Sequence, residues 1–146
     1  MCKAIATLSI AAVFATAATA GLAEDYEVKM LNRGADGIMV FEPALVEIEP
    51  GDTVHFIATD KGHNVETIAG MIPEGFEPFR SAINQDFSIS FDEAGLYGVK
   101  CTPHFAMGMV GLIAVGDVEA GVEPADGVRL PRKAEQRFDA IFASLQ

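Results

Sequence analysis

The chain contains no tryptophan, only two cysteines and only three histidines among 146 residues. Cys2 stands before the first apolar stretch, so a mature chain that loses this stretch keeps Cys101 alone and has no internal disulfide. Basic residues are also scarce. The chain has 10 lysines and arginines and 21 aspartates and glutamates, so its net charge is −11. A protein this acidic is not expected to bind nucleic acids or anionic membranes broadly.

Residues 1–23 have the composition of a secretory signal peptide. Lys3 is their only charged residue, an alanine-rich apolar stretch follows it, and small residues occupy positions 18, 20, 21 and 23. The pattern fits cleavage after residue 20 or after residue 23. The apolar stretch is too short to cross a membrane comfortably, and no run of about 20 apolar residues follows it. We therefore expect an exported, soluble chain, with a net charge of −12 once Lys3 is removed.

Residues 24–117 show the pattern of a mainly β domain. Polar and apolar residues alternate in short stretches, which is typical of half-buried strands. Turn signals containing Gly, Asn or Asp separate these stretches, and short strands spaced in this way predict an antiparallel β-sandwich. The alternating stretches are residues 26–31, 46–49, 53–57 and 86–91, and two further strands are predicted at residues 96–101 and 110–115.

Residues 118–146 change character and predict a helical extension that packs on the same domain. Pro131 suits the first position of a helix, and apolar residues then recur at helical spacing between charged ones. This amphipathic helix is expected over residues 131–145, and its apolar positions are Ala134, Phe138, Ile141, Phe142 and Leu145.

The segment from Cys101 to Met109 holds the residues with the most distinctive chemistry. It reads Cys-Thr-Pro-His-Phe-Ala-Met-Gly-Met and offers a thiol, an imidazole and two thioethers within nine residues. Soft sulfur ligands combined with imidazole favour copper over calcium or magnesium, and two histidines with one cysteine and a weak axial methionine are typical of blue copper sites. His63, in a turn well upstream, is the candidate for the second histidine. His55 alternates with apolar neighbours and is interpreted as a strand-face residue that binds no metal.

Residues 62–65 and 97–110 together resemble the ligand regions of the cupredoxins, and the similarity is greatest to the pseudoazurins. Residues 30–34, 39–43, 50–52 and 71–75 and the helical tail also resemble that family, so the likeness covers nearly the whole mature chain. The resemblance implies a Greek-key β-sandwich with a C-terminal helical extension and one type 1 copper per chain.

The resemblance also implies which residues bind the metal. In these families the ligand methionine is followed by one residue and then by glycine, which Met109 satisfies and Met107 does not. Met107 is therefore interpreted as an apolar group at the surface of the loop. The backbone N–H of Asn64 is implied as a donor to the cysteine sulfur, and Met39 is either a plain core residue or a neighbour of the metal. The implied copper ligands are His63, Cys101, His104 and Met109.

By this resemblance the protein is a periplasmic one-electron carrier that cycles between copper(II) and copper(I). The family implies a nitrite reductase as the electron acceptor and a cytochrome as the donor, with a monomeric carrier that docks transiently. The expected docking face is an apolar patch around His104, formed by Pro103, Phe105, Ala106 and Met107. Its expected basic rim consists of Lys61, Lys100, Arg33 and Arg80.

Three other functions are compatible with copper binding. An oxidase or reductase would need a second metal site, and three histidines, with Lys100 and Thr102 rather than histidine beside the cysteine, argue against such an enzyme. An amicyanin-like acceptor of electrons from an amine-oxidising dehydrogenase would have a shorter ligand loop and no helical tail. A copper-storage protein would hold a colourless or rapidly exchanging copper(I) ion.

Overall fold

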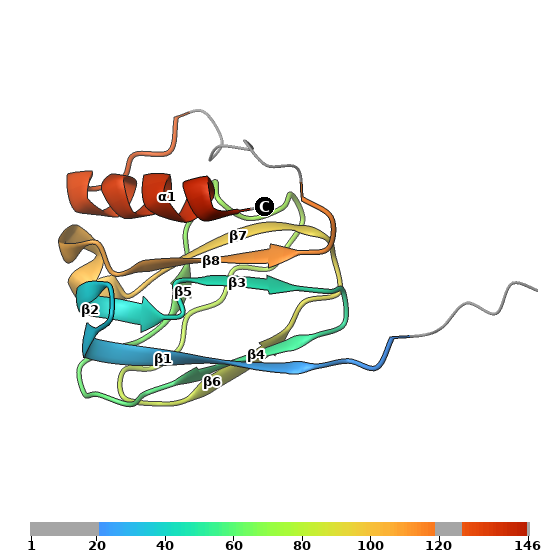
Figure 1. Cartoon of the computed structure of the whole chain (residues 1–146), viewed down its shortest axis with the longest axis horizontal. Helices are drawn as coiled ribbons and strands as arrows, with labels where there is room; N and C mark the ends of the chain where they lie inside the picture. Colours follow the sequence, from blue (N-terminus) through green and yellow to red (C-terminus); the bar gives the residue numbers. More distant parts are fainter. Residues whose placement is uncertain (1–20, 119–126, 146) are drawn as a thin grey trace, which may run out of the picture.

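The computed structural model describes residues 21–118 and 127–145, which form two packed β-sheets and one α-helix (Figure 1). Each sheet has four strands. The first sheet has the order β2 (Gly37–Glu42), β1 (Asp25–Gly34), β4 (Thr53–Ile57) and β6 (Phe87–Ser90). The second has the order β3 (Leu45–Ile48), β8 (Val110–Val115), β7 (Gly95–Lys100) and β5 (Glu66–Thr67). The predicted β-sandwich is confirmed.

The predicted signal peptide lies almost wholly outside the described residues, which begin at Gly21. The start of the predicted extension, at residues 119–126, also lies outside them. Within the described ranges, no helix combines the length and the apolar character that crossing a membrane requires.

Both sheets are mixed, so the prediction of an antiparallel sandwich is wrong in part. β1 pairs with β4 in parallel, and β3 pairs with β8 in parallel. Alternation along a strand reports which face is buried and does not report the direction of the neighbouring strand. The first predicted strand, residues 26–31, is too short, because β1 continues through Gly34 and the chain reverses at Ala35 and Asp36.

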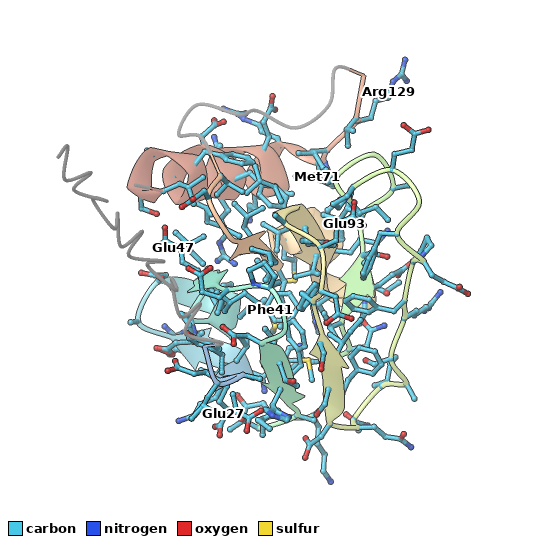
Figure 2. All side chains as sticks on the ribbon, turned by 90° about the vertical axis from the view of Figure 1, so that its right-hand side faces the viewer. Glu27, Phe41, Glu47, Met71, Glu93 and Arg129 are labelled. Carbon is cyan, nitrogen blue, oxygen red and sulfur yellow. The ribbon has the colours of Figure 1, made fainter. Side chains whose placement is uncertain are left out.

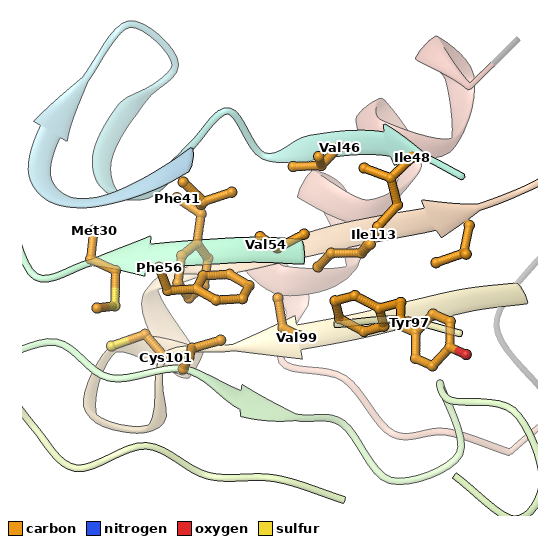
Figure 3. Packing of buried hydrophobic residues seen from close by; sticks show 14 of the residues in the cluster. Met30, Phe41, Val46, Ile48, Val54, Phe56, Tyr97, Val99, Cys101 and Ile113 are labelled. Atoms are coloured by element: carbon orange, nitrogen blue, oxygen red, sulfur yellow. The ribbon is translucent and has the colours of Figure 1, made fainter. Parts of the chain in front are cut away.

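The main core fills the space between the two sheets. Phe41 lies in this interior, whereas Glu27 and Glu47 project outward (Figure 2). The packed residues run from Tyr97 at one end to Cys101 at the other (Figure 3). Because Cys101 belongs to this cluster and is fully buried, its side chain is held in a rigid and dry environment.

Helix α1 (Arg132–Ser144) covers the outer face of the second sheet, as the spacing of apolar residues predicts. Ala134, Phe138 and Ile141 are buried and pack with Val110 and Leu112 of β8 in a second apolar cluster. All six residues of β8 are buried because the first sheet lies on one side of it and the helix on the other. Pro131, predicted as the first helical residue, stands instead at the N-cap, and the helix begins at Arg132.

Candidate metal centre

Three potential metal ligands converge at one end of the sandwich. His63 lies between β4 and β5, Cys101 directly follows β7, and His104 lies in the 3₁₀ helix η1 (Thr102–Met107). The Nδ1 atoms of the two histidines each lie 3.6 Å from the Cys101 sulfur, and the three donor atoms are within 4.8 Å of one another. The structure thus brings together the two histidines and the cysteine that the sequence predicts as ligands.

A buried asparagine ties the two ligand segments to each other. The side-chain oxygen of Asn64 accepts a hydrogen bond from the Thr102 N–H at 2.8 Å, and its side-chain nitrogen donates to the Thr102 hydroxyl at 3.0 Å. Asn64 follows His63 directly, and Thr102 follows Cys101. The two hydrogen bonds therefore fix the position of one ligand relative to the other.

Backbone hydrogen bonds close the segment from Cys101 to Met109, here called the ligand loop, on itself. The Cys101 N–H donates to the Met109 carbonyl at 3.0 Å, and the Met109 N–H donates to the His104 carbonyl at 3.1 Å. Pro103 stands in the first turn of η1, where its missing N–H leaves no donor unsatisfied. The loop consequently has little freedom to rearrange.

The orientation of His63 is set by a residue that the sequence analysis did not single out. Nε2 of His63 lies 2.9 Å from the side-chain oxygen of Asn32 on β1. Since an amide oxygen only accepts, Nε2 carries the proton and the Nδ1 lone pair is free on the side of Cys101. A hydrogen bond of this kind typically supports a metal-binding histidine. No pattern in the sequence marks this role of Asn32.

Burial changes the protonation equilibria of the site. Loss of solvation raises the pKa of the Cys101 thiol, while the backbone N–H groups of Asn64 and His104 act in the opposite direction by hydrogen bonding to the sulfur. Loss of solvation, followed by the proximity of His104, lowers the pKa of His63. The Asn64 N–H contact agrees with the one implied by the family resemblance, and the neutral His63 imidazole is the form that binds metals.

The geometry and the donor types both fit a copper ion. A metal ion with bonds of about 2.3 Å to sulfur and about 2.0 Å to nitrogen, at trigonal to tetrahedral angles, holds a sulfur and a nitrogen ligand atom about 3.5–3.7 Å apart. The observed separations of 3.6 Å from sulfur to each nitrogen match this range. One thiolate with two imidazoles is a donor set that suits copper.

The two methionines of the loop differ in environment. Met109 is fully buried and belongs to the core cluster that contains Cys101, whereas Met107 is partly exposed and lines a groove between α1 and β2. Met39 packs against the same core cluster as Met109. His55 lies elsewhere, where its ring nitrogens contact Ser88 at 2.6 Å and Asp25 at 3.1 Å.

The predicted basic rim is joined by an acidic residue that sequence analysis missed. The carboxylate of Glu66 lies 3.9 Å from the charged groups of both Arg80 and Lys100 and accepts a hydrogen bond from the Thr102 hydroxyl at 2.6 Å. Lys100 also lies over the ring of Phe105, 4.9 Å from its centroid. Glu66 thus pairs with two of the four cations of the predicted rim.

Comparisons with known proteins agree with this site. The family described as copper binding proteins of the plastocyanin/azurin family matches residues 28–116. A pseudoazurin of Paracoccus pantotrophus is 51% identical over 92% of this chain and 93% of its own length.

Solved structures show the same relationship. The crystal structure of pseudoazurin from Methylobacterium extorquens AM1 is 48% identical, covers 84% of this chain and 99% of its own, and superposes with a TM-score of 0.78. An amicyanin structure is 29% identical, covers 63% of this chain and 82% of its own, and has a TM-score of 0.51. The chain therefore belongs to the pseudoazurins, copper-binding electron carriers of the plastocyanin/azurin family that are not enzymes.

Proposed function

We propose that this protein is a soluble, monomeric, periplasmic carrier of single electrons whose copper ion is bound by His63, Cys101, His104 and Met109. The convergence of one sulfur and two imidazole nitrogens at 3.6 Å is the observation that carries this proposal. Burial of Met109 in the same cluster as Cys101 supports Met109 as the fourth residue that would hold the ion. Export by a signal peptide covering residues 1–23 would place the mature chain in the periplasm.

The surroundings of the site suit electron transfer. Copper(I) and copper(II) prefer different geometries, so a ligand set that is held rigidly reduces the rearrangement that accompanies each transfer. Cys101 and His63 are fully buried, whereas His104 is partly exposed beside the exposed Pro103 and Ala106. His104 is therefore the ligand through which we expect electrons to enter and leave.

We further propose that the electron acceptor is a periplasmic nitrite reductase and that a cytochrome supplies the electrons. The apolar patch around His104 would contact the partner, and the basic rim of Lys61, Lys100, Arg33 and Arg80 would attract an acidic docking face. Three of the four cations are exposed and Lys100 is half-buried. Steering of this kind mainly raises the association rate.

Charge reversal at Lys61 tests both the carrier function and the docking face. Lys61 is exposed and lies two residues before His63, so Lys61→Glu is expected to slow electron transfer to a copper nitrite reductase about fivefold at low ionic strength. The rate is measured by rapid mixing of the reduced, copper-loaded carrier with the oxidised reductase. The difference from the unchanged protein should shrink as salt is added.

The matched control is Arg129→Glu, which makes the same change in charge at an exposed residue that projects from the segment before α1 (Figure 2). Equal rates and equal salt dependence for Lys61→Glu and the unchanged protein would refute the docking face. Failure of the unchanged carrier to pass any electron to the reductase would refute that acceptor. A colourless copper(I) ion that exchanges rapidly would point instead to storage.

A further inference from the structure

Arg137 of helix α1 connects the helix to two segments near the metal centre. Its Nη1 donates to the carbonyl oxygens of Met39 at 2.6 Å and Gly108 at 2.8 Å, and its Nη2 donates to the carbonyl of Ile38 at 2.8 Å. Met39 and Ile38 belong to β2, and Gly108 lies in the ligand loop. The N-terminal end of α1 and strand β2 lie at the same end of the molecule (Figure 1). One planar cation thus joins three elements.

The contact with Gly108 fixes the peptide unit that leads into Met109. The carbonyl of this peptide unit accepts from Arg137, and its N–H donates to the His104 carbonyl at 3.1 Å. Hydrogen bonds at both ends of the peptide hold its plane in one orientation. Because the plane sets the direction in which the next residue leaves, it also sets where the Met109 side chain begins.

The contact with Met39 holds an unusual backbone conformation. Met39 has a φ of 51°, in the left-handed region that residues other than glycine rarely occupy. Such a conformation persists where surrounding structure enforces it. The Met39 carbonyl accepts from Arg137, and its side chain packs against the core cluster that contains Cys101 and Met109.

We propose that Arg137 is a positioning residue of the metal centre, which fixes the Gly108–Met109 peptide and the Met39 backbone against each other. This inference rests on the proposed function, because it takes Met109 as the axial copper ligand. Arg137 lies outside residues 28–116, the part that matches the plastocyanin/azurin family. The C-terminal helix therefore supplies part of the frame of the site, through a guanidinium that makes charge-assisted hydrogen bonds.

Two substitutions separate the charge of Arg137 from its planar shape. Arg137→Met removes the charge and keeps an unbranched stem in the helix, whereas Arg137→Lys keeps the charge on a group that cannot reproduce the fork. Arg132, on the same helix, is exposed, and Arg132→Met and Arg132→Lys are the matched controls. Circular dichroism shows which of the variants are folded, and only folded variants are compared.

The first readout needs no copper. In the metal-free protein, hydrogen exchange of the Met109 amide is expected to become about tenfold faster in Arg137→Met, because one of the two hydrogen bonds that hold its peptide is lost. Arg137→Lys should show a smaller acceleration. Neither Arg132 variant should change it.

The second readout is the visible and EPR spectrum of the copper-loaded protein, which a purely structural role of Arg137 would leave unchanged. We expect both Arg137 variants to alter the intensity ratio of the visible bands, with Arg137→Lys closer to the unchanged protein. If Arg137→Met does not fold, the Arg137→Lys spectrum decides alone.

Unchanged spectra together with unchanged Met109 exchange in a folded variant would overturn this inference and leave the proposed function intact. A copper-loaded unchanged protein without strong visible absorption would refute the proposed function. The exchange experiment would still report whether Arg137 holds the peptide.

Discussion

Replacing Cys101 by serine is expected to abolish the intense visible absorption of the oxidised, copper-loaded protein. The band arises from charge transfer between a thiolate and copper(II), and Cys101 is the free cysteine of the described residues. A serine hydroxyl is a harder and much weaker donor at neutral pH, so copper affinity should fall as well. The oxygen is smaller than the sulfur, so the serine side chain fits within the same buried position.

The measurement is the absorption spectrum after copper loading and oxidation, with Met107→Leu as the matched control. Met107 is a second sulfur-containing residue of the same loop, but it is partly exposed and lines the groove beside α1. Met107→Leu should keep the band. A Cys101→Ser protein that keeps its colour would show that another group binds the ion.

Replacing Gly108 by alanine is expected to lower the free energy of unfolding by about 2–4 kcal/mol. Gly108 has a φ of 88°, and an added Cβ would lie 2.8 Å from the backbone carbonyl oxygen of Lys133 in α1. The backbone cannot yield as a flexible side chain can, so the helix and the ligand loop must move apart. The visible and EPR spectra should change as well, because Gly108 immediately precedes Met109.

Gly75→Ala is the matched control for this substitution. Gly75 has a φ of 86°, and nothing lies within 4 Å of the Cβ position there. It therefore carries the same backbone strain without the contact, and a loss of about 1 kcal/mol is expected. Equal losses of stability for the two variants in chemical denaturation would show that the helix does not press on the ligand loop.

The strands and the helix were predictable wherever burial alternates along the chain. In α1, Ala134 and Phe138 face the second sheet at helical spacing, and in β4, Val54 and Phe56 alternate with partly exposed residues. Strand β2 was not predicted, because Val40 and Phe41 are adjacent and both buried, which breaks the period of two. The parallel pairings were missed because strand direction leaves no mark on alternation.

The predicted ligands that stand close together in the sequence were the easier part of the site to recognise. Cys101 and His104 stand three residues apart in one loop, and their sulfur and Nδ1 atoms meet at 3.6 Å. His63 was predicted as the second histidine from its position in a turn and from the resemblance to a family. Sequence spacing alone does not show which distant segments lie together in the fold.

The supporting contacts were not readable from the sequence. Asn32 reaches His63 across 31 positions, and Arg137 reaches Met39 across 98. Nothing in the sequence distinguishes Glu66, which lies between Arg80 and Lys100, from the other acidic residues. Single polar residues of this kind carry no local pattern, so their partners become known only when the fold brings them together.

Titration of the metal-free protein, produced as residues 24–146, with copper(II) tests the copper site most directly. We expect an intense visible band that saturates at one copper per chain, with the narrow EPR hyperfine splitting of copper bound to a thiolate. A pale product with the wide splitting of ordinary copper(II), or saturation at any other ratio, would contradict a single site built from His63, Cys101 and His104.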